Sequence, residues 1–339
     1  MPPPPIQSSL KAACLQPTTL RAYRVQVTLL LQHLRMSLRE LLQHSSRTVD
    51  LHLADYIDHL HAAQGSYSYA CQAANGLVFY CPRLRGRLHE SQQRLRGWKK
   101  LAPSVAHPPI TLELTALLSV TLAKQGLHAE AVGCLLAFDC LLRVSELTNI
   151  RYSDVALPLD ARFGSSHVRM AVRLASTKTG ANQSVALTEP AVEQVLLHYL
   201  SVRSWAAADF IFPFSPARFR RALARVAADC GLDALQLVPH SFRHGGATRA
   251  ALMGDSVESI MLRGRWKALE SVKNYLQMAR ARLLLQQIPA AAAQLGTVLL
   301  RTLVPCMRLL LPAAAAAPVS EAVQPAARRS APTQRVRFA

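Results

Sequence analysis

Acidic residues are scarce in this sequence. Twenty Asp and Glu face thirty-nine Lys and Arg among 339 residues, which gives a formal net charge of +19 at pH 7. This excess of one sign is larger than solubility requires and indicates a polyanionic partner, with nucleic acid as the first candidate. A basic protein associated with a membrane is the alternative.

Long apolar runs are missing as well. The longest, Gly296–Leu311, is interrupted by Arg301, Pro305 and Arg308. It therefore falls short of the ~18 uninterrupted apolar residues that a membrane-spanning helix needs. The N-terminus, MPPPPIQSSLK, lacks the apolar core of a signal peptide. We expect no membrane association.

Paired cysteines and metal-ligand spacings are also absent. The seven cysteines are odd in number and form no CxxC pair, which predicts neither a disulfide framework nor a zinc site. Cys134 and Cys140 lie in an apolar helical run and are expected in the core. The sequence has no Gly-rich phosphate loop, so we expect no metal and no small-molecule cofactor. A reducing, intracellular location follows.

The chain is long enough for two domains, and half of its residues are hydrophobic. LAPSVAHPPIT, with Pro103, Pro108 and Pro109, reads as a linker. Periodic apolar residues predict helices before and after it. We expect a disordered leader (1–17), a helical DNA-binding domain (18–102), a linker (103–109), a larger domain (110–288) and a mostly disordered Ala/Pro/Arg-rich tail (289–339).

A dense basic stretch closes the first domain. PRLRGRLHESQQRLRGWKK carries seven basic side chains and a single acid, Glu90. One interpretation is a solvated helix face. At this density, contact with nucleic-acid phosphates is favoured. The candidate DNA-binding residues are Arg83, Arg85, Arg87, Arg94, Arg96, Lys99 and Lys100.

The larger domain is predicted to be helical apart from one hairpin. Apolar and polar residues alternate over His167–Leu174, STKTGANQ makes a turn, and Ser184–Leu187 returns. Helices are predicted over Leu112–Lys124, Ala129–Leu142, Glu189–Val202 and Pro216–Cys230. The expected fold class is therefore mainly α with a small β-hairpin.

Pro239–Tyr275 carries residues that could act on a phosphodiester. Without a metal, such a bond is attacked most simply by a side-chain hydroxyl, while cations hold the charge that builds on the phosphate oxygens. Arg243 follows His240 by three residues at a helix start, where an anion is favoured. Each of these signals also has an alternative interpretation. The spacing of His240 and Arg243 could arise by chance, and Arg143 with Glu146, which are also three residues apart, could form an ordinary helix salt bridge. Lys178 could be an exposed turn residue, and Tyr275 could be a core residue.

Five boxes then occur in a specific order: LLRVSEL, TKTGANQSVAL, HSFRHGGAT, GRW and VKNYL. Over about residues 110–288 they resemble the tyrosine recombinases, also called phage integrases. Trp266 precedes Tyr275 by nine residues. Many members carry His at this position, and the Trp makes the chain resemble the Cre recombinase subgroup. Arg265 stands where a small or apolar residue is commoner. The resemblance assigns catalysis to Arg143, Lys178, His240, Arg243, Trp266 and Tyr275, with Glu146 and His244 in support.

The resemblance implies a recombinase catalytic fold behind an all-helical, SAM-like core-binding domain. It also implies that Tyr275 attacks DNA and forms a 3′-phosphotyrosine, without metal or ATP. Arg143 and Arg243 would hold the non-bridging oxygens, His240 would act as base, and Lys178 would protonate the leaving 5′-oxygen. Trp266 would donate its indole N–H to the phosphate.

Further implications concern the assembly. Glu146 would orient Arg143 or His240. The partner would be double-stranded DNA, bound by a homotetramer on two sites, and the protein would belong to a mobile element. It would act where the DNA is, in the nucleus of a eukaryotic host or the cytoplasm of a bacterium. An inactive DNA-binding remnant and a type IB topoisomerase are the alternatives.

Overall fold

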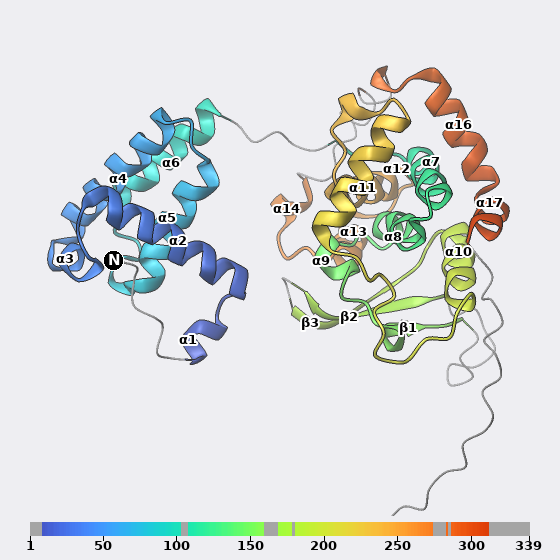
Figure 1. Ribbon diagram of the computed structural model, residues 1–339, viewed down its shortest axis with the longest axis horizontal. Helices are drawn as coiled ribbons and strands as arrows, with labels where there is room; N and C mark the ends of the chain where they lie inside the picture. The colour runs from blue at the N-terminus through green and yellow to red at the C-terminus, as the bar shows by residue number, and fades with distance from the viewer. Residues whose placement is uncertain are drawn as a thin grey trace, which may run out of the picture. The chain divides into compact units, whose positions relative to one another are not determined.

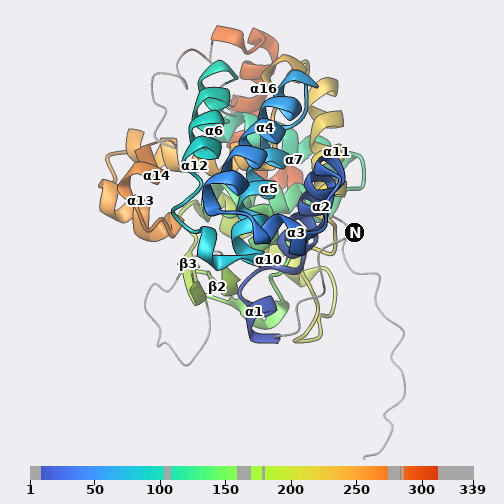
Figure 2. The same ribbon diagram turned by 90° about the vertical axis from the view of Figure 1, so that its left-hand side faces the viewer.

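The computed structural model describes residues 9–102, 108–158, 169–177, 180–273, 283 and 286–311. The chain divides into two compact units, residues 1–106 and 107–339, and the division falls inside the expected linker (Figures 1 and 2). Helices dominate both units, and the strands of the described residues form one small sheet in the second. The expected fold class is confirmed.

The N-terminal unit is a bundle of short helices around one apolar core. Its buried centre includes Val27, Leu30, Leu53 and Leu77. Ser37 and Glu40 form a capping box that starts a helix too short to show periodicity in the sequence, so it was not predicted. The elements are α1 (Ser9–Ala13), α2 (Pro17–Leu34), α3 (Leu38–Gln43), α4 (Ser46–Ala62), α5 (Tyr67–Tyr80), η1 (Pro82–Leu84) and α6 (His89–Leu101).

The expected disordered leader is wrong for residues 9–13. They form α1, and the Lys11 ammonium lies 5.3 Å from the centroid of the Phe79 ring on α5. This cation–π attraction joins residues that are distant in the sequence. No local sequence pattern predicts it. Residues 1–8 lie outside the described part of the chain.

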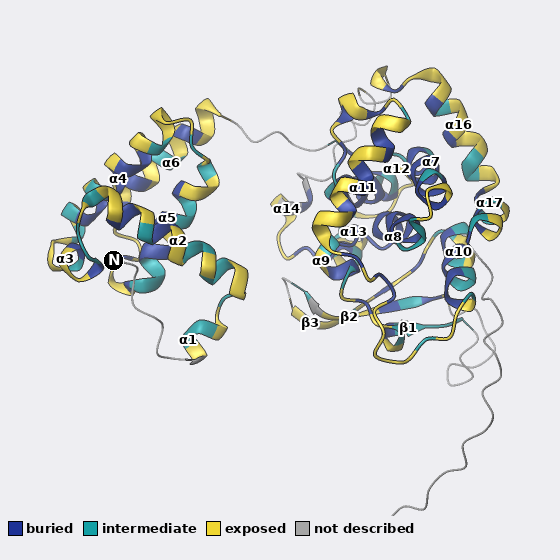
Figure 3. Cartoon of the chain, in the orientation of Figure 1, coloured by how far each residue is buried: buried dark blue, intermediate teal, exposed yellow. Residues whose placement is uncertain are grey.

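The C-terminal unit is built around two apolar helices, α7 (Leu112–Lys124) and α8 (His128–Asp139), which are buried almost all round (Figure 3). Cys134 lies in this core, as expected, and burial raises the pKa of its thiol well above the usual value. The elements that follow are α9 (Val144–Leu147), η2 (Tyr152–Asp154), α10 (Pro190–Ser201), α11 (Pro216–Asp229), η4 (Asp233–Leu235), α12 (Pro239–Leu252), α13 (Val257–Gly264), α14 (Leu269–Lys273), α16 (Ala290–Arg301) and α17 (Leu303–Leu310).

The described strands form an antiparallel sheet in the order β1–β2–β3, from β1 (Val155–Ala156), β2 (Ala171–Thr177) and β3 (Gly180–Ala186). Val172 pairs with Val185 and Leu174 with Gln183. The predicted alternation is confirmed, since Val172 and Leu174 are buried while Arg173 is exposed. The two-residue strand β1 was not predicted, because two residues carry no alternation.

The expected disordered tail is wrong for residues 290–311. Helices α16 and α17 pack against α7 and α10 (Figure 1), and Leu303, Met307 and Leu311 join the main core. A Cβ atom at Gly296 would lie 2.8 Å from the carbonyl oxygen of Glu113, so α16 approaches α7 closely through small residues. Residues 312–339 lie outside the described part.

Within the part of the chain that the structure describes, no single helix is long and apolar enough to cross a membrane. Only α16 and α17 together, bent by 83° between them, have the length and composition of a span.

Candidate active site

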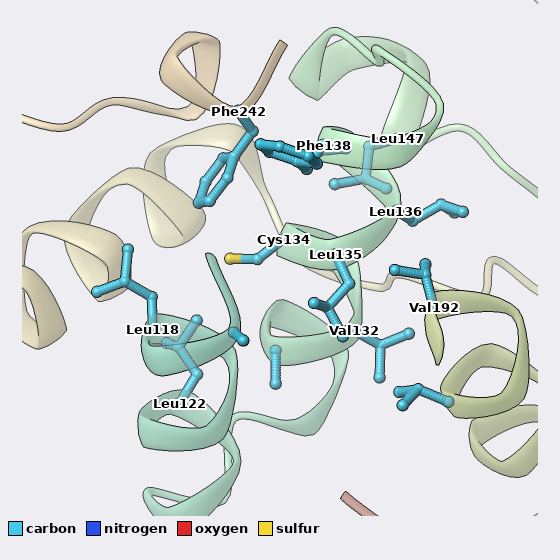
Figure 4. Close-up of a cluster of buried hydrophobic side chains, with 14 of the residues drawn as sticks. Leu118, Leu122, Val132, Cys134, Leu135, Leu136, Phe138, Leu147, Val192 and Phe242 are labelled. Atoms are coloured by element: carbon cyan, nitrogen blue, oxygen red, sulfur yellow. The ribbon is translucent and has the colours of Figure 1, made fainter. Parts of the chain in front are cut away.

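The first arginine lies at a helix start that is fixed by the core. Phe138 at the end of α8 packs with Leu147 of α9 and Phe242 of α12 (Figure 4). This contact brings the segment between α8 and α9 next to α12. Arg143 is the N-cap residue of α9 and Arg243 lies on α12, so residues a hundred positions apart in the sequence come together.

Arg243 is the most deeply buried charge of the site. Its side chain is 0% exposed, and its guanidinium donates to the carbonyl oxygens of Leu141 and Gly264. The ring centroid of Trp266 lies 4.2 Å from its central carbon. Burial of a charge is costly unless it is compensated. Here carbonyl dipoles and an aromatic face surround the cation.

Two glycines allow α12 to reach this position. A Cβ atom at Gly245 would overlap the carbonyl oxygen of Ile110, and one at Gly246 would overlap the carbonyl oxygen of Phe138. Both positions are therefore limited to a hydrogen atom as side chain. The Gly-Gly that follows Arg243 serves this packing between α12 and α8, which sets the depth of the arginine.

We predict that Gly246→Ala destabilises the C-terminal unit by about 1–3 kcal/mol, because overpacking forces two helices apart. The urea midpoint of that unit should fall. Gly97→Ala is the matched control, since nothing lies within 4 Å of a Cβ built on the exposed face of α6, and it should leave stability equal or slightly raised. An unchanged midpoint for Gly246→Ala would contradict this packing.

Glu146 is the carboxylate at the centre of the cluster. It is 3% exposed and sits at the third position of α9. Its Oε1 accepts from Arg143 Nη1 at 2.6 Å, and its Oε2 accepts from the Arg143 backbone N–H at 2.9 Å and from Arg265 Nη2 at 2.9 Å. The Nη1 of Arg243 is 3.9 Å from the same Oε2. Glu146 thus contacts three arginines.

The protonation of Glu146 follows from these contacts. Burial alone raises the pKa of this carboxyl, but the Arg265 charge and the hydrogen bonds from Arg143 outweigh it, and the pKa lies below the usual value. Glu146 is therefore ionised at neutral pH. Among the described residues, three guanidinium groups then surround this one carboxylate in a largely buried place. Such a place suits an anion.

Trp266 follows the last turn of α13 and is 8% exposed. A Cβ atom at Gly264 would overlap its ring, so this glycine gives Trp266 room to lie over Arg243. The same turn is anchored by Arg263, which donates to the Asp139 carboxylate at 2.7 Å and to the Thr188 hydroxyl. These bonds tie α13 to the end of α8 and the start of α10.

His240 and His244 occupy successive turns on one side of α12. Their rings meet edge to face with centroids 5.1 Å apart. His240 is half-buried in the first turn, where the helix dipole favours a nearby anion. His244 is buried behind it. The two imidazoles are therefore close enough to contact one another on the helix that carries Arg243.

Lys178 and Tyr275 lie outside the described residues, so the structure does not test either assignment. Strand β2, which leads toward position 178, does lie near the cluster. Glu146 lines one pocket with Leu174 and Ala175 of β2. The base of the hairpin is thus beside the carboxylate that holds Arg143.

The candidate DNA-binding residues lie on η1, α6 and the segment between them. Arg94 forms ion pairs with Asp58 at 3.1 Å and Glu90 at 3.0 Å, and Arg83 donates to the Leu42 carbonyl. These two arginines tie parts of the N-terminal unit together. The other five are exposed: Arg85, Arg87, Arg96, Lys99 and Lys100.

Sequence reasoning missed the role of Arg265. The only signal was its place where a small or apolar residue is commoner. The structure explains that preference, because Arg265 has left-handed backbone angles that glycine adopts most easily. No group of three or more His, Cys, Asp or Glu side chains that could hold a metal was found in the described ranges.

The chain is similar to one family model and, in fold, to solved structures of known proteins. The model described as "Phage integrase family" matches residues 112–282. Two solved structures of the Tn1549 transposon integrase in complex with DNA, one with a circular intermediate and one with a transposon right end, are similar in fold: TM-scores 0.51 and 0.52, both 14% identical, covering 78% and 79% of this chain and 98% and 99% of those. A crystal structure of XerA recombinase is 16% identical with a TM-score of 0.39, covering 82% of this chain and 94% of that one. No curated protein sequence matches the chain.

Proposed function

The chain belongs to the phage integrase family of tyrosine-type, site-specific DNA recombinases, and from this premise we propose that Tyr275 and the arginine cluster around Glu146 break and rejoin DNA. The motif resemblance read from the sequence is thereby confirmed at the level of the family. The observation that carries the proposal is the convergence of Arg143, Arg243 and Arg265 on the single carboxylate of Glu146.

The first step is attack of the Tyr275 hydroxyl oxygen on the scissile phosphorus. The P–O bond to the 5′-oxygen breaks, and the DNA 3′-phosphate becomes joined to Tyr275. The tyrosine proton passes to a base, for which His240 in the first turn of α12 is the candidate. The leaving 5′-oxygen takes a proton, for which Lys178 is the candidate. Because the phosphoester is conserved in the protein linkage, the reverse attack by a 5′-hydroxyl reseals DNA without ATP.

The arginines match the charge that this step builds. A phosphodiester carries one negative charge, and the pentacoordinate transition state carries about two. Three guanidinium groups converge on Glu146, and their charge would stabilise this transition state more than the substrate. Arg143, whose side chain is 20% exposed, is the cation that solvent and DNA reach first. Its planar fork can give paired N–H donors to two non-bridging oxygens.

The experiment that tests this function uses a library of nicked duplexes. Cleavage near the nick releases a short fragment with the 5′-hydroxyl, so the strand cannot be resealed. The protein is incubated with them in excess EDTA and then denatured. We expect a protein–DNA adduct that survives denaturant and carries the label of the 3′-phosphate side. Adducts that require a divalent metal, or none on any duplex, would overturn the proposal.

We propose further that the N-terminal unit binds the DNA backbone through its exposed basic side chains. Each phosphate contact releases counterions, so affinity falls with salt in proportion to the number of contacts. The double change Lys99→Gln with Lys100→Gln should reduce the slope of log affinity against log salt by about 2. Arg94→Gln, at a residue already paired with two carboxylates, is the control and should leave the slope unchanged. Equal slopes for all three proteins would contradict the assignment.

Four copies of the chain acting on two duplexes form the proposed assembly. Exchange between two duplexes breaks four strands, and each copy offers one Tyr275. Mass measurements on the complex trapped with nicked duplexes should give four chains and two duplexes; one chain per duplex would contradict it. Such a complex would act wherever the cell keeps its DNA.

A further inference from the structure

Arg265 occupies the position just after α13, with left-handed backbone angles (φ 58°, ψ 41°). Its backbone N–H donates to Leu262 and caps the helix. Glycine is the residue that helices normally place at such a left-handed cap. An arginine there is strained, and its side chain is 3% exposed. A solvent-facing role does not account for it, so its contacts inside the protein must.

The Arg265 guanidinium has acceptors for all four of its terminal N–H groups. Nη1 donates to the carbonyl oxygens of Arg263 at 2.8 Å and Cys140 at 3.4 Å. Nη2 donates to the Leu141 carbonyl and to Glu146 Oε2, both at 2.9 Å. One side chain therefore joins the end of α8, the start of α9 and the turn after α13. These four donors are committed to the protein, and the fifth, Nε, is buried, so Arg265 is placed to act on the phosphate through its partners.

Two of its partners are also partners of the other arginines. The Leu141 carbonyl accepts from both Arg265 and Arg243. The Glu146 carboxylate accepts from both Arg265 and Arg143. Leu141 itself has a positive φ of 52°, so its carbonyl is held in an uncommon direction that serves two guanidinium groups. Arg265 is thus connected to each of the other two arginines by a single shared acceptor.

The sharing of Glu146 determines what Arg143 can still bind. A lone carboxylate facing an arginine prefers a two-pronged contact that takes two N–H groups. Here Arg265 holds Oε2, and the Arg143 side chain reaches only Oε1, through Nη1. The Arg143 groups that do not contact Glu146 stay available on the exposed side. Without Arg265, Glu146 would be free to turn and take more of them.

We propose that Arg265 is a positioning residue for DNA cleavage, which holds the Glu146 carboxylate and the Leu141 carbonyl so that Arg143 and Arg243 keep N–H groups directed at the scissile phosphate. This inference rests on the proposed function. Arg265 is not a catalytic residue in this account, because its terminal N–H groups all donate to protein acceptors. It is a third arginine that the resemblance to the family did not assign.

The test uses Arg265→Gly, which removes the guanidinium and retains the left-handed backbone. DNA affinity should be unchanged, and cleavage at saturating DNA should fall about a hundredfold, the scale of a small misplacement of reacting groups. Arg265→Lys keeps a charge without the fork and should recover part of the rate. Arg35→Gly is the matched control, because Arg35 is also a left-handed arginine after a helix but lies in the N-terminal unit.

Two further readouts separate positioning from general stability. If Arg265 acts mainly through Glu146, then in a Glu146→Gln background the change Arg265→Gly should cost less than about twofold in rate, since residues in one network are not additive. Full additivity would overturn the proposal. The proposal would also be overturned if the rate loss disappeared when wild type and Arg265→Gly are each assayed the same number of degrees below their own melting temperature.

The pH profile gives the second readout. The charged groups that face Glu146 in the described residues are Arg143, Arg243 and Arg265, with Arg151 and Arg173 along the adjoining pocket. The Arg265 charge lowers the pKa of Glu146, so its removal should move the acid limb of the cleavage rate to higher pH. An acid limb at the same pH in wild type and Arg265→Gly would overturn the proposal.

The amount of adduct separates this inference from the proposed function. Equal amounts of adduct with wild type and Arg265→Gly would contradict this inference alone. The absence of an adduct with the wild-type protein would contradict the proposed function.

Discussion

Tyr275→Phe is expected to eliminate the denaturant-resistant DNA adduct while DNA affinity stays at the wild-type level. The change removes one oxygen atom, which in the proposed reaction is the only atom that joins phosphorus. Loss of a covalent nucleophile lowers rates by roughly 10⁴-fold or more, so the adduct should fall below detection. Gel analysis of denatured reactions on nicked duplexes measures it.

Tyr69→Phe is the control for this change. Tyr69 is 49% exposed on α5 and is therefore an accessible hydroxyl that chemistry alone could use. Its loss should leave the adduct unchanged. An adduct that survives Tyr275→Phe and disappears with another tyrosine would move the nucleophile elsewhere in the chain.

Arg243→Lys is expected to lower the cleavage rate by about 10²–10³-fold, the usual effect of removing a transition-state donor. Lysine keeps the charge but offers a single nitrogen. It cannot contact the carbonyls of Leu141 and Gly264 and a phosphate oxygen together in a planar fork. Most DNA affinity should remain, because the proposed backbone contacts of the N-terminal unit are unchanged. Single-turnover cleavage and equilibrium binding on the same duplex measure the two effects.

Arg249→Lys provides the comparison on the same helix. Arg249 is half-buried on α12 and pairs with Glu189 at 2.8 Å, outside the cluster around Glu146. Its replacement should change cleavage little. If Arg243→Lys lost DNA binding and cleavage in parallel, Arg243 would be a residue that positions DNA. Normal cleavage by Arg243→Ala would contradict any role of Arg243 in the reaction.

The sequence predicted those parts of the fold that local patterns determine. Both ends of α7 agree with the predicted limits, because apolar periodicity and turn residues define them. The buried side of β2 was likewise visible as alternation. The same patterns failed for α16, whose alanines and Gly296 read as low complexity. The small size of these residues allows close packing against α7. Because α7 is distant in the sequence, no local pattern shows this packing.

The candidate site divides in the same way. Residue type and order identified Arg143, Glu146, Arg243 and Trp266, and the structure brings these four together. The sequence did not show that Glu146 is shared among three guanidinium groups, because that depends on how the turn after α13 meets α9. Arg265 looked like a departure from the common pattern. It proved to be the residue that completes the contacts of the buried carboxylate.

The central claim is that Tyr275 carries the DNA during the reaction. The adduct formed on a nicked duplex can be digested with trypsin and nuclease and its peptides weighed by mass spectrometry. The sequence places Tyr275 in the tryptic peptide Asn274–Arg280. We predict that this peptide bears a nucleotide through its 3′-phosphate. A nucleotide on any other peptide, or a link through a 5′-phosphate, would contradict the account.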